Sequence, residues 1–141
     1  MICKVNGDKT ILTFGVFDML HIGHILLLQR AKELGGKLIV AVQDEDSILK
    51  YKPGTRIIYS TEERMFMVGS LRYVDEVVGY KDVDIDIQHI AFDLLVLGQD
   101  QNHSGFQKAI EWCRENSKQI VRLPRTEGIS STLMREYSKT K

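Results

Sequence analysis

Two histidines three residues apart, His21 and His24, follow a short turn that contains Gly15. An amphipathic segment begins directly after them, which places both imidazoles at the start of a predicted helix. A helix start offers unpaired backbone N–H groups and the positive end of the helix dipole, so it favours anions, phosphate above all. Gly15 and Gly23 let the backbone approach a ligand closely, and imidazoles donate to charge that develops on phosphate oxygens. These residues predict a nucleotide or phosphate site, with Asp18 orienting the turn.

Two other interpretations of the histidine pair are a helix cap and a zinc site. An i, i+3 pair can share a metal, but no third ligand stands in a matching local motif, so we expect no metal held by side chains. Cys3 and Cys113 lack CxxC spacing, which argues against a zinc site or a disulfide scaffold and fits a reducing cytoplasm. The acidic run from Asp82 to Asp86 lacks the glycine of a calcium loop and predicts a solvated helix start.

Three blocks of the sequence carry a resemblance to a known family. The first reads Thr13-Phe14-Gly15-Val16-Phe17-Asp18-Met19-Leu20-His21-Ile22-Gly23-His24 and resembles the HxGH signature of the nucleotidyltransferase superfamily. The other two are similar to segments of its cytidylyltransferase branch: Arg72-Tyr73-Val74-Asp75-Glu76-Val77 and Arg125-Thr126-Glu127-Gly128-Ile129-Ser130-Ser131-Thr132. The blocks lie in the family's order, and the group they resemble most is the small bacterial glycerol-3-phosphate cytidylyltransferases.

The resemblance implies transfer of CMP from CTP to a small phosphorylated alcohol, with Mg²⁺ on the triphosphate and release of pyrophosphate. Glycerol 3-phosphate is the leading acceptor, feeding polyol-phosphate polymers of a cell wall or capsule; ethanolamine-, choline- and sugar-phosphates are alternatives. A phosphate monoester has a second pKa of about 6 and is mostly a dianion at pH 7. The enzyme must therefore supply alignment and charge neutralisation rather than a base.

Two rival functions stay open beside this one. The first is an adenylyltransferase of the same superfamily, of the FAD-synthetase-like or heptose-phosphate kind, and the second is a nucleotide sensor without catalysis. The block from Arg125 to Thr132 argues against the adenylyltransferase, and the presence of both histidines argues against the sensor.

The resemblance also implies the roles of single residues. His21, His24, Lys50, Lys52 and Arg125 are implied as catalytic; the alternative for the basic stretch Lys50–Arg56, which we expect to be a mobile loop, is solvated surface. Arg64, Arg72 and Lys52 are implied at the substrate phosphate, and the guanidinium of an arginine can bind phosphate bidentately. The alternative for an arginine is an exposed or ion-paired side chain. The residues implied at the nucleotide are Thr13, Phe14, Gly15, Val16, Phe17, Gly23, Asp100, Arg125, Thr126, Gly128, Ile129, Ser130, Ser131 and Thr132.

One segment departs from the family pattern. Where the most similar group has Gly-Asp-Asp-Trp, this chain has Gly98-Gln99-Asp100-Gln101, so Asp100 matches and the tryptophan is replaced by Gln101. An amide both donates and accepts, so we expect Gln101 to line the acceptor site and favour an acceptor with additional polar groups.

Segments of strand and helix pattern alternate along the chain. Gly35-Gly36 ends the first helix, and Ser60 with Glu63 forms a predicted capping box. This alternation predicts an α/β fold: a Rossmann-like doubly wound parallel five-stranded sheet with helices on both faces, in a single domain. The expected strands are 11–14, 37–42, 77–78, 94–98 and 119–122, and the expected helices are 25–34, 61–71, 85–92, 106–115 and 131–137.

Length and charge bound the remaining possibilities. At 141 residues we expect one cytidylyltransferase-like domain over 1–141. Nineteen basic and nineteen acidic residues give zero net charge, so we expect no nucleic-acid or membrane partner beside CTP and the phosphorylated acceptor. The chain shows no apolar stretch typical of a leader or membrane span, and we expect a cytoplasmic protein. Relatives pair through the block at Arg72–Glu76, so we expect a homodimer.

Overall fold

The computed structural model describes residues 8–124. Its strands are β1 (Thr10–Gly15), β2 (Lys37–Gln43), β3 (Glu76–Tyr80), β4 (Leu94–Gly98) and β5 (Gln119–Leu123). Its helices are α1 (Ile22–Glu33), α2 (Glu45–Tyr51), α3 (Thr61–Gly69), α4 (Val83–Asp86), a 3₁₀ turn η1 (Ile87–His89) and α5 (Ser104–Glu115).

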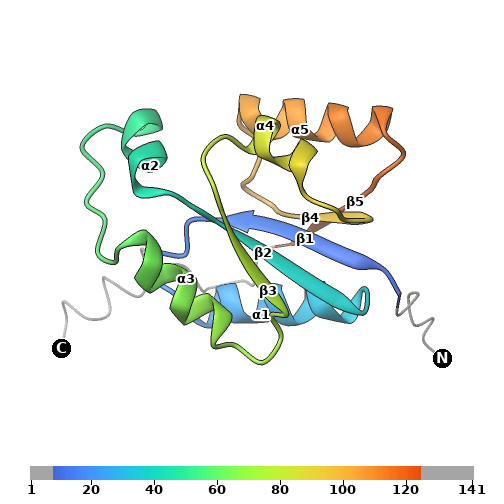
Figure 1. Cartoon of the computed structure of the whole chain (residues 1–141), viewed down its shortest axis with the longest axis horizontal. Helices are drawn as coiled ribbons and strands as arrows, with labels where there is room; N and C mark the ends of the chain where they lie inside the picture. The colour runs from blue at the N-terminus through green and yellow to red at the C-terminus, as the bar shows by residue number, and fades with distance from the viewer. Residues whose placement is uncertain (1–7, 125–141) are drawn as a thin grey trace.

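The five strands form one parallel sheet in the order β3-β2-β1-β4-β5. Helices α1 and α3 cover one face, and α4 and α5 cover the other (Figure 1). The predicted α/β, Rossmann-like doubly wound fold is therefore confirmed. The chain runs from β1 to β2 and β3 on one side of β1 and then returns to β4 and β5 on its other side, so the strand order reverses between β1 and β4. The turns after β1 and β4 therefore lie next to each other at the carboxyl edge, where such folds bind ligands.

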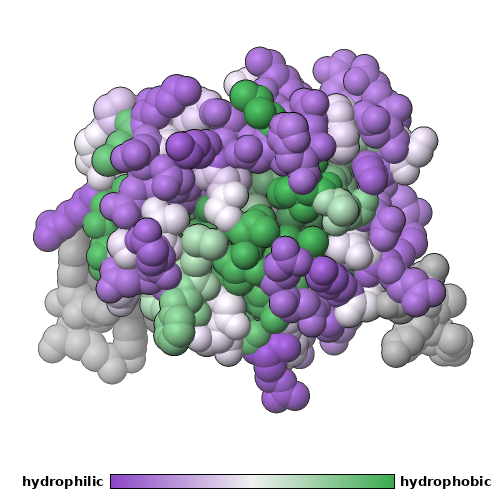
Figure 2. Space-filling view, viewed as in Figure 1, coloured by the Kyte–Doolittle hydropathy of each residue, from purple (hydrophilic) through white to green (hydrophobic). Residues whose placement is uncertain are grey.

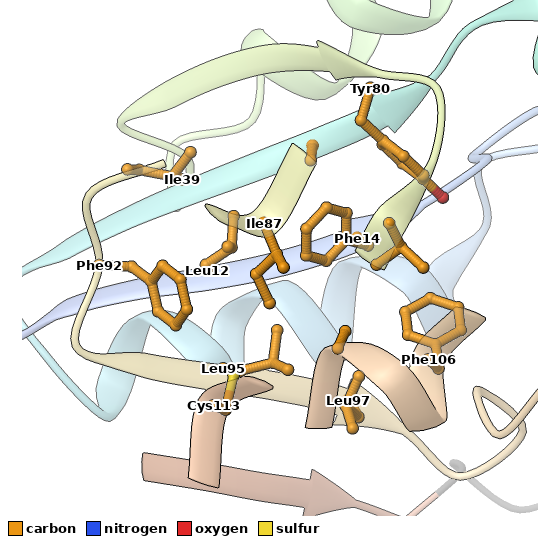
Figure 3. Packing of buried hydrophobic residues seen from close by; sticks show 13 residues of the cluster. Leu12, Phe14, Ile39, Tyr80, Ile87, Phe92, Leu95, Leu97, Phe106 and Cys113 are labelled. Carbon is orange, nitrogen blue, oxygen red and sulfur yellow. The ribbon is translucent and has the colours of Figure 1, made fainter. Parts of the chain in front are cut away.

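Strand β1 divides its side chains between two cores. Leu12 and Phe14 pack with α5 on one face, whereas Ile11 packs with Leu28 of α1 on the other. Figure 3 shows the first cluster, in which the ring of Phe14 lies edge-on to Tyr80, with centroids 4.9 Å apart. Burial on both faces explains why β2 and β4 contain continuous hydrophobic runs and why β1 is mostly apolar.

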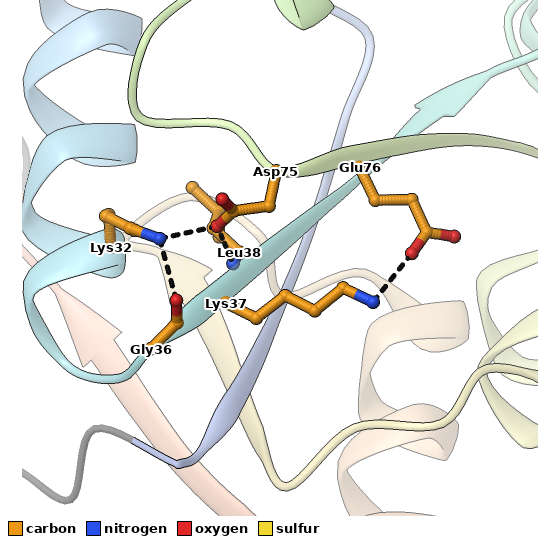
Figure 4. A network of polar contacts seen from close by, with 6 residues as sticks. All are labelled: Lys32, Gly36, Lys37, Leu38, Asp75 and Glu76. Atoms are coloured by element: carbon orange, nitrogen blue, oxygen red, sulfur yellow. Dashed lines mark hydrogen bonds and ion pairs between the residues drawn. The ribbon is translucent and has the colours of Figure 1, made fainter.

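The amino edge of the sheet is closed by a polar network (Figure 4). Lys32 at the end of α1 donates to the carboxylate of Asp75 and to the carbonyl of Gly36, and Asp75 in turn accepts the N–H of Leu38. The turn between α1 and β2 is also tight, because a Cβ on Gly35 would lie 2.6 Å from the carbonyl oxygen of Lys9. The connections at this edge are thus fixed by direct contacts.

Two elements differ from the sequence prediction. The helix expected over 85–92 is wrong in its bounds: α4 begins at Val83 and gives way to the 3₁₀ turn that ends at His89. Asp93 explains the early end, because its backbone N–H donates to the carbonyl of Thr10 and its carboxylate accepts the N–H of Thr10, which requires an extended approach to β4.

Helix α2 was not predicted, and it takes in Lys50 and Tyr51 from the expected loop. Asp44 caps it by accepting the N–H of Asp46 at 3.1 Å, and Glu45 and Asp46 lie in its first turn. These are ordinary start signals. The helix predicted over 131–137 and the full extent of the expected domain lie outside the described residues. Within residues 8–124, no helix is long and apolar enough to cross a membrane.

Candidate active site

The turn after β1 has an unusual conformation that depends on Gly15. Phe17 has a φ of 55°, in the left-handed region that bulky residues rarely occupy. Its ring folds back into the core, and a Cβ on Gly15 would lie 2.6 Å from it. The same ring meets that of His24 edge-on, with centroids 5.4 Å apart. Gly15 is thus required by the packing of Phe17, which in turn supports a histidine.

His21 and His24 cap helix α1 reciprocally. Nδ1 of His21 accepts the N–H of Gly23 at 3.0 Å, and Nδ1 of His24 accepts the N–H of His21 at 3.2 Å. Their rings stack with centroids 3.9 Å apart. Because each Nδ1 accepts from the backbone, each neutral ring carries its proton on Nε2. The pair therefore caps the helix and also offers two Nε2–H donors.

Burial keeps both rings uncharged. It lowers the pKa of His24 to about 4, with a further contribution from His21, and it lowers the pKa of His21 as well. Desolvation disfavours the charged form of an imidazole, which explains the direction. Near pH 7 both rings are therefore neutral, and they can act as hydrogen-bond donors rather than as cations.

Asp18 joins this turn to the segment that precedes α3. Its carboxylate accepts the N–H of Ile58 at 2.8 Å and that of Tyr59 at 2.9 Å. Two backbone N–H groups on one carboxylate hold the far end of residues 52–60 against the turn, in keeping with the expected orienting role.

Arg64, expected at the substrate phosphate, lies elsewhere. Its side chain has 0% exposure, and its guanidinium donates to the carbonyls of Val16 at 3.0 Å, Gln43 at 2.7 Å and Tyr59 at 3.1 Å. Thr61 Oγ1 accepts a fourth bond. The structure places Arg64 beneath the glycine turn, where it holds backbone carbonyls and is not presented to a ligand.

Three of the residues expected at the nucleotide, Thr13, Phe14 and Phe17, have buried side chains. Thr13 Oγ1 donates to the carbonyl of Val96 at 3.0 Å, and the ring of Phe14 belongs to the core. Their side chains therefore support the turn from the sheet, leaving the backbone of Gly15, Val16 and Phe17 as the part of this block that faces the carboxyl edge.

A cavity of about 570 Å³ opens beside the same turn. Gly15, Val16, Lys52, Asp100 and Gln101 line it, together with residues of α4 and α5. Lys52 therefore lies in the wall of this cavity, and its role at a phosphate stays a prediction. Lys50 instead lies with its Nζ 5.2 Å from the centroid of the Tyr51 ring and is not part of the cavity wall.

Tyr51 and Asp82 are cavity residues that sequence reasoning missed. The hydroxyl of Tyr51 donates to the carboxylate of Asp82, which connects the end of α2 to the segment after β3. The hydrogen bond to Asp82 raises the pKa of Tyr51. A pair thirty-one residues apart leaves no local signal in the sequence.

Arg72, the other arginine expected at the substrate phosphate, follows α3 and precedes β3, so it lies at the amino edge, opposite the histidines. Its guanidinium carbon is 5.8 Å from the centroid of the Tyr73 ring. The block Arg125–Thr132 lies outside the described residues. Among residues 8–124, no three His, Cys, Asp or Glu side chains are grouped to hold a metal ion.

Comparison with known proteins gives a consistent result. The chain is 39% identical over 132 residues to glycerol-3-phosphate cytidylyltransferase of Bacillus subtilis, covering 91% of this chain and 95% of the relative. It is 36% identical to the bifunctional protein HldE of Shewanella amazonensis over 92% of this chain but 27% of that protein. The crystal structure of a lipopolysaccharide core biosynthesis protein from Thermoplasma volcanium superposes with a TM-score of 0.74 at 26% identity, covering 86% of this chain and all of that one.

The histidine pair, the glycine turn and the residues that line the cavity all lie within the part of the chain that matches one family model. Residues 12–137 match the family model described as cytidylyltransferase-like. The chain is therefore a nucleotidyltransferase of the cytidylyltransferase-like family.

Proposed function

We propose that the protein transfers CMP from CTP to a small phosphorylated alcohol, with glycerol 3-phosphate as the leading acceptor. The observation that carries this proposal is the pair of neutral Nε2–H donors at the start of α1, separated by one glycine turn from a cavity that reaches Lys52. The similarity to glycerol-3-phosphate cytidylyltransferase over nearly the whole chain supports both the nucleotide and the acceptor.

In this proposal the phosphates of CTP lie at the start of α1, with Mg²⁺ carried on the triphosphate. His21 and His24 donate to oxygens that gain charge as the α-phosphorus is attacked, and the positive end of the helix acts in the same direction. The acceptor phosphate attacks as a dianion, so neither histidine needs to take a proton. In this proposal Arg125 is a catalytic residue, and the nucleotide-binding residues after it are Thr126, Gly128, Ile129, Ser130, Ser131 and Thr132.

The acceptor is proposed to occupy the cavity, with its phosphate toward Lys52 and the glycine turn. Lysine provides a compact cation that neutralises phosphate charge. In this proposal the acceptor phosphate meets the α-phosphorus at Gly15 and Val16, because in-line displacement requires the two reacting groups to be in contact.

A second candidate is transfer to a different phosphate acceptor, such as a sugar phosphate, or transfer of AMP from ATP. The 36% identity to a segment of the bifunctional protein HldE supports this second candidate, because it is close to the 39% identity to glycerol-3-phosphate cytidylyltransferase.

Pyrophosphate release with CTP or ATP against a panel of acceptors tests both candidates. We expect CTP with glycerol 3-phosphate to give the highest kcat/KM, with ethanolamine-, choline- and sugar-phosphates below it. A higher rate with ATP would replace the proposal by the second candidate. If no acceptor of the panel gave pyrophosphate release with either nucleotide, both transfers would be excluded.

The same proposal includes a cytoplasmic homodimer with no nucleic-acid or membrane partner. Figure 2 shows apolar side chains gathered over the face that edge strand β3 presents. Phe66 on the neighbouring helix α3 is 77% exposed. Within residues 8–124 no strand pairs with the outer edge of β3, and an apolar face beside such an edge is a feature that a second copy of the chain would cover.

A further inference from the structure

Gln101 connects the ends of the neighbouring strands β1 and β4. Its side-chain Oε1 accepts the N–H of Gly98 at 2.9 Å, and its Nε2 donates to the carbonyl of Phe14 at 2.7 Å. One carboxamide thereby satisfies a donor at the end of β4 and an acceptor at the end of β1. The sequence prediction that Gln101 lines the acceptor site stays a prediction: Gln101 is in the cavity wall, and these two bonds leave one N–H and one lone pair of its carboxamide.

The two strands separate where Gln101 enters. Their paired register ends at Thr13 and Val96, although β1 runs to Gly15 and β4 to Gly98. In a parallel ladder continued by one residue, the carbonyl of Phe14 would accept the N–H of Gly98 directly. The carboxamide of Gln101 bridges these two groups in place of that direct hydrogen bond, so both are satisfied while the strands diverge. We call this bridge of two hydrogen bonds the rung.

The backbone from which the side chain of Gln101 extends is held by hydrogen bonds of its own. The backbone N–H of Gln101 donates to the carbonyl of Gly98 at 3.2 Å, and Nη1 of Arg122 on β5 donates to the carbonyls of Gly98 and Gln101 at 2.8 and 3.1 Å. The turn after β4 is therefore held before the side chain of Gln101 reaches β1.

The position of the rung gives it a functional consequence. Phe14 directly precedes the glycine turn, and Gly98 directly precedes Gln99 and Asp100, so the two turns that bound the cavity are joined through Gln101. We propose that Gln101 is a positioning residue that sets the separation of these turns, and hence the alignment of the acceptor with the nucleotide. The kinetic part of this inference rests on the proposed function.

The test compares Gln101→Met, which keeps the length of the side chain but cannot form the rung, with Gln88→Met. Gln88 is a matched control, because its Nε2 also donates to a backbone carbonyl, that of Asp84, but it does not line the cavity. Amide hydrogen exchange reads the rung without any substrate. We expect exchange at Gly98 to accelerate about tenfold or more in Q101M, as expected for loss of one hydrogen bond, and to stay unchanged in Q88M. Unchanged exchange at Gly98 would overturn the proposal.

Kinetics of the same variants test the functional part. A lost alignment lowers kcat, so we expect Q101M to lose about tenfold in kcat, with KM for CTP and for the acceptor within a few-fold of the original. A rise in acceptor KM at constant kcat would instead show that Gln101 binds the acceptor, and would overturn the positioning role. If the unaltered protein transfers no nucleotide, the proposed function fails while the exchange result still decides whether the rung exists.

Discussion

The imidazole of His24 accepts the backbone N–H of His21 at 3.2 Å, so the two histidines are joined through the backbone as well as by ring stacking. This bond fixes the proton of His24 on Nε2 and points that nitrogen away from the helix cap. A structural role and a catalytic role thus use different atoms of the same ring.

Replacing either histidine should remove far more activity than stability. We expect His21→Ala and His24→Ala to lower kcat by about 10²–10³, the usual cost of a lost donor to developing charge. A lost cap costs only about 1 kcal/mol of stability, so both variants should fold. Pyrophosphate release and thermal unfolding measure the two effects, with the exposed His89→Ala as control. Activity close to the original in either variant would rule out its donor role.

The low pKa of His24 should appear in the pH dependence of stability. The unfolded chain binds a proton near pH 6.5, whereas the folded protein does so only near pH 4. Below the unfolded pKa the unfolded state therefore holds the additional proton, and stability falls as the pH drops from 6.5 toward 4 and levels off below. Urea midpoints across this range should fall more steeply for the original protein than for His24→Gln; parallel curves would contradict the shift.

Arg64 should be needed mainly for stability. Arg64→Met leaves the carbonyls of Val16, Gln43 and Tyr59 without their donor, and each unsatisfied buried group costs about 1–3 kcal/mol. We expect a loss of at least about 3 kcal/mol in the free energy of unfolding by urea denaturation. Arg30→Met on the exposed side of α1 is the matched control and should change little. If Arg64→Met were as stable as the control, the carbonyl contacts would not matter.

The packing of Phe17 predicts that Gly15 cannot carry a side chain. The added Cβ of Gly15→Ala would lie 2.6 Å from the ring, so Phe17 has to move and the support of His24 is lost. We expect a cost of about 1–3 kcal/mol from overpacking, together with a clear fall in kcat. In Gly79→Ala the new Cβ would meet its nearest atoms at an ordinary 3.9 Å, and stability and rate should hold. Equal behaviour of the two variants would contradict the packing argument.

The proposed homodimer can be tested at the exposed Phe66. Light scattering should give a mass of two chains at micromolar concentration, and Phe66→Asp should shift it toward one chain, because a buried unpaired carboxylate opposes association. Circular dichroism checks that the variant is folded. A single-chain mass for the original protein would reject the dimer, and an unaffected dimer in the variant would place the interface elsewhere.

Sequence reasoning succeeded where the signal was local. Ser60 and Glu63 form the predicted capping box, since both partners lie within one helical turn. The strand Leu94–Gly98 was predicted with its observed bounds, because a continuous apolar run is enclosed by Asp93 and a turn. The capping of α1 by His21 and His24, which was one interpretation of the pair, likewise involves residues three apart.

The remaining features depend on partners that are distant in the sequence. Arg64 bonds to carbonyls of Val16 and Gln43, which belong to two other turns, so nothing near Arg64 distinguishes it from a surface arginine. Gln101 reaches Phe14 across eighty-seven positions. Helix α2 is different, since its Asp44 cap and acidic first turn are local start signals that the sequence contains. The lysines at its end are equally typical of a basic loop, which explains why a loop was predicted there.

The closed amino edge has a consequence for how this protein can diverge. Lys32, Asp75 and the tight approach of Gly35 to Lys9 leave no room there for inserted residues. Residues 52–60, by contrast, are held at their far end by Asp18 and cross the carboxyl edge without a strand partner. Insertions and deletions should therefore accumulate on one side of the sheet only, and changes in length there would alter the reach of Lys52 while the hydrophobic cores stay intact.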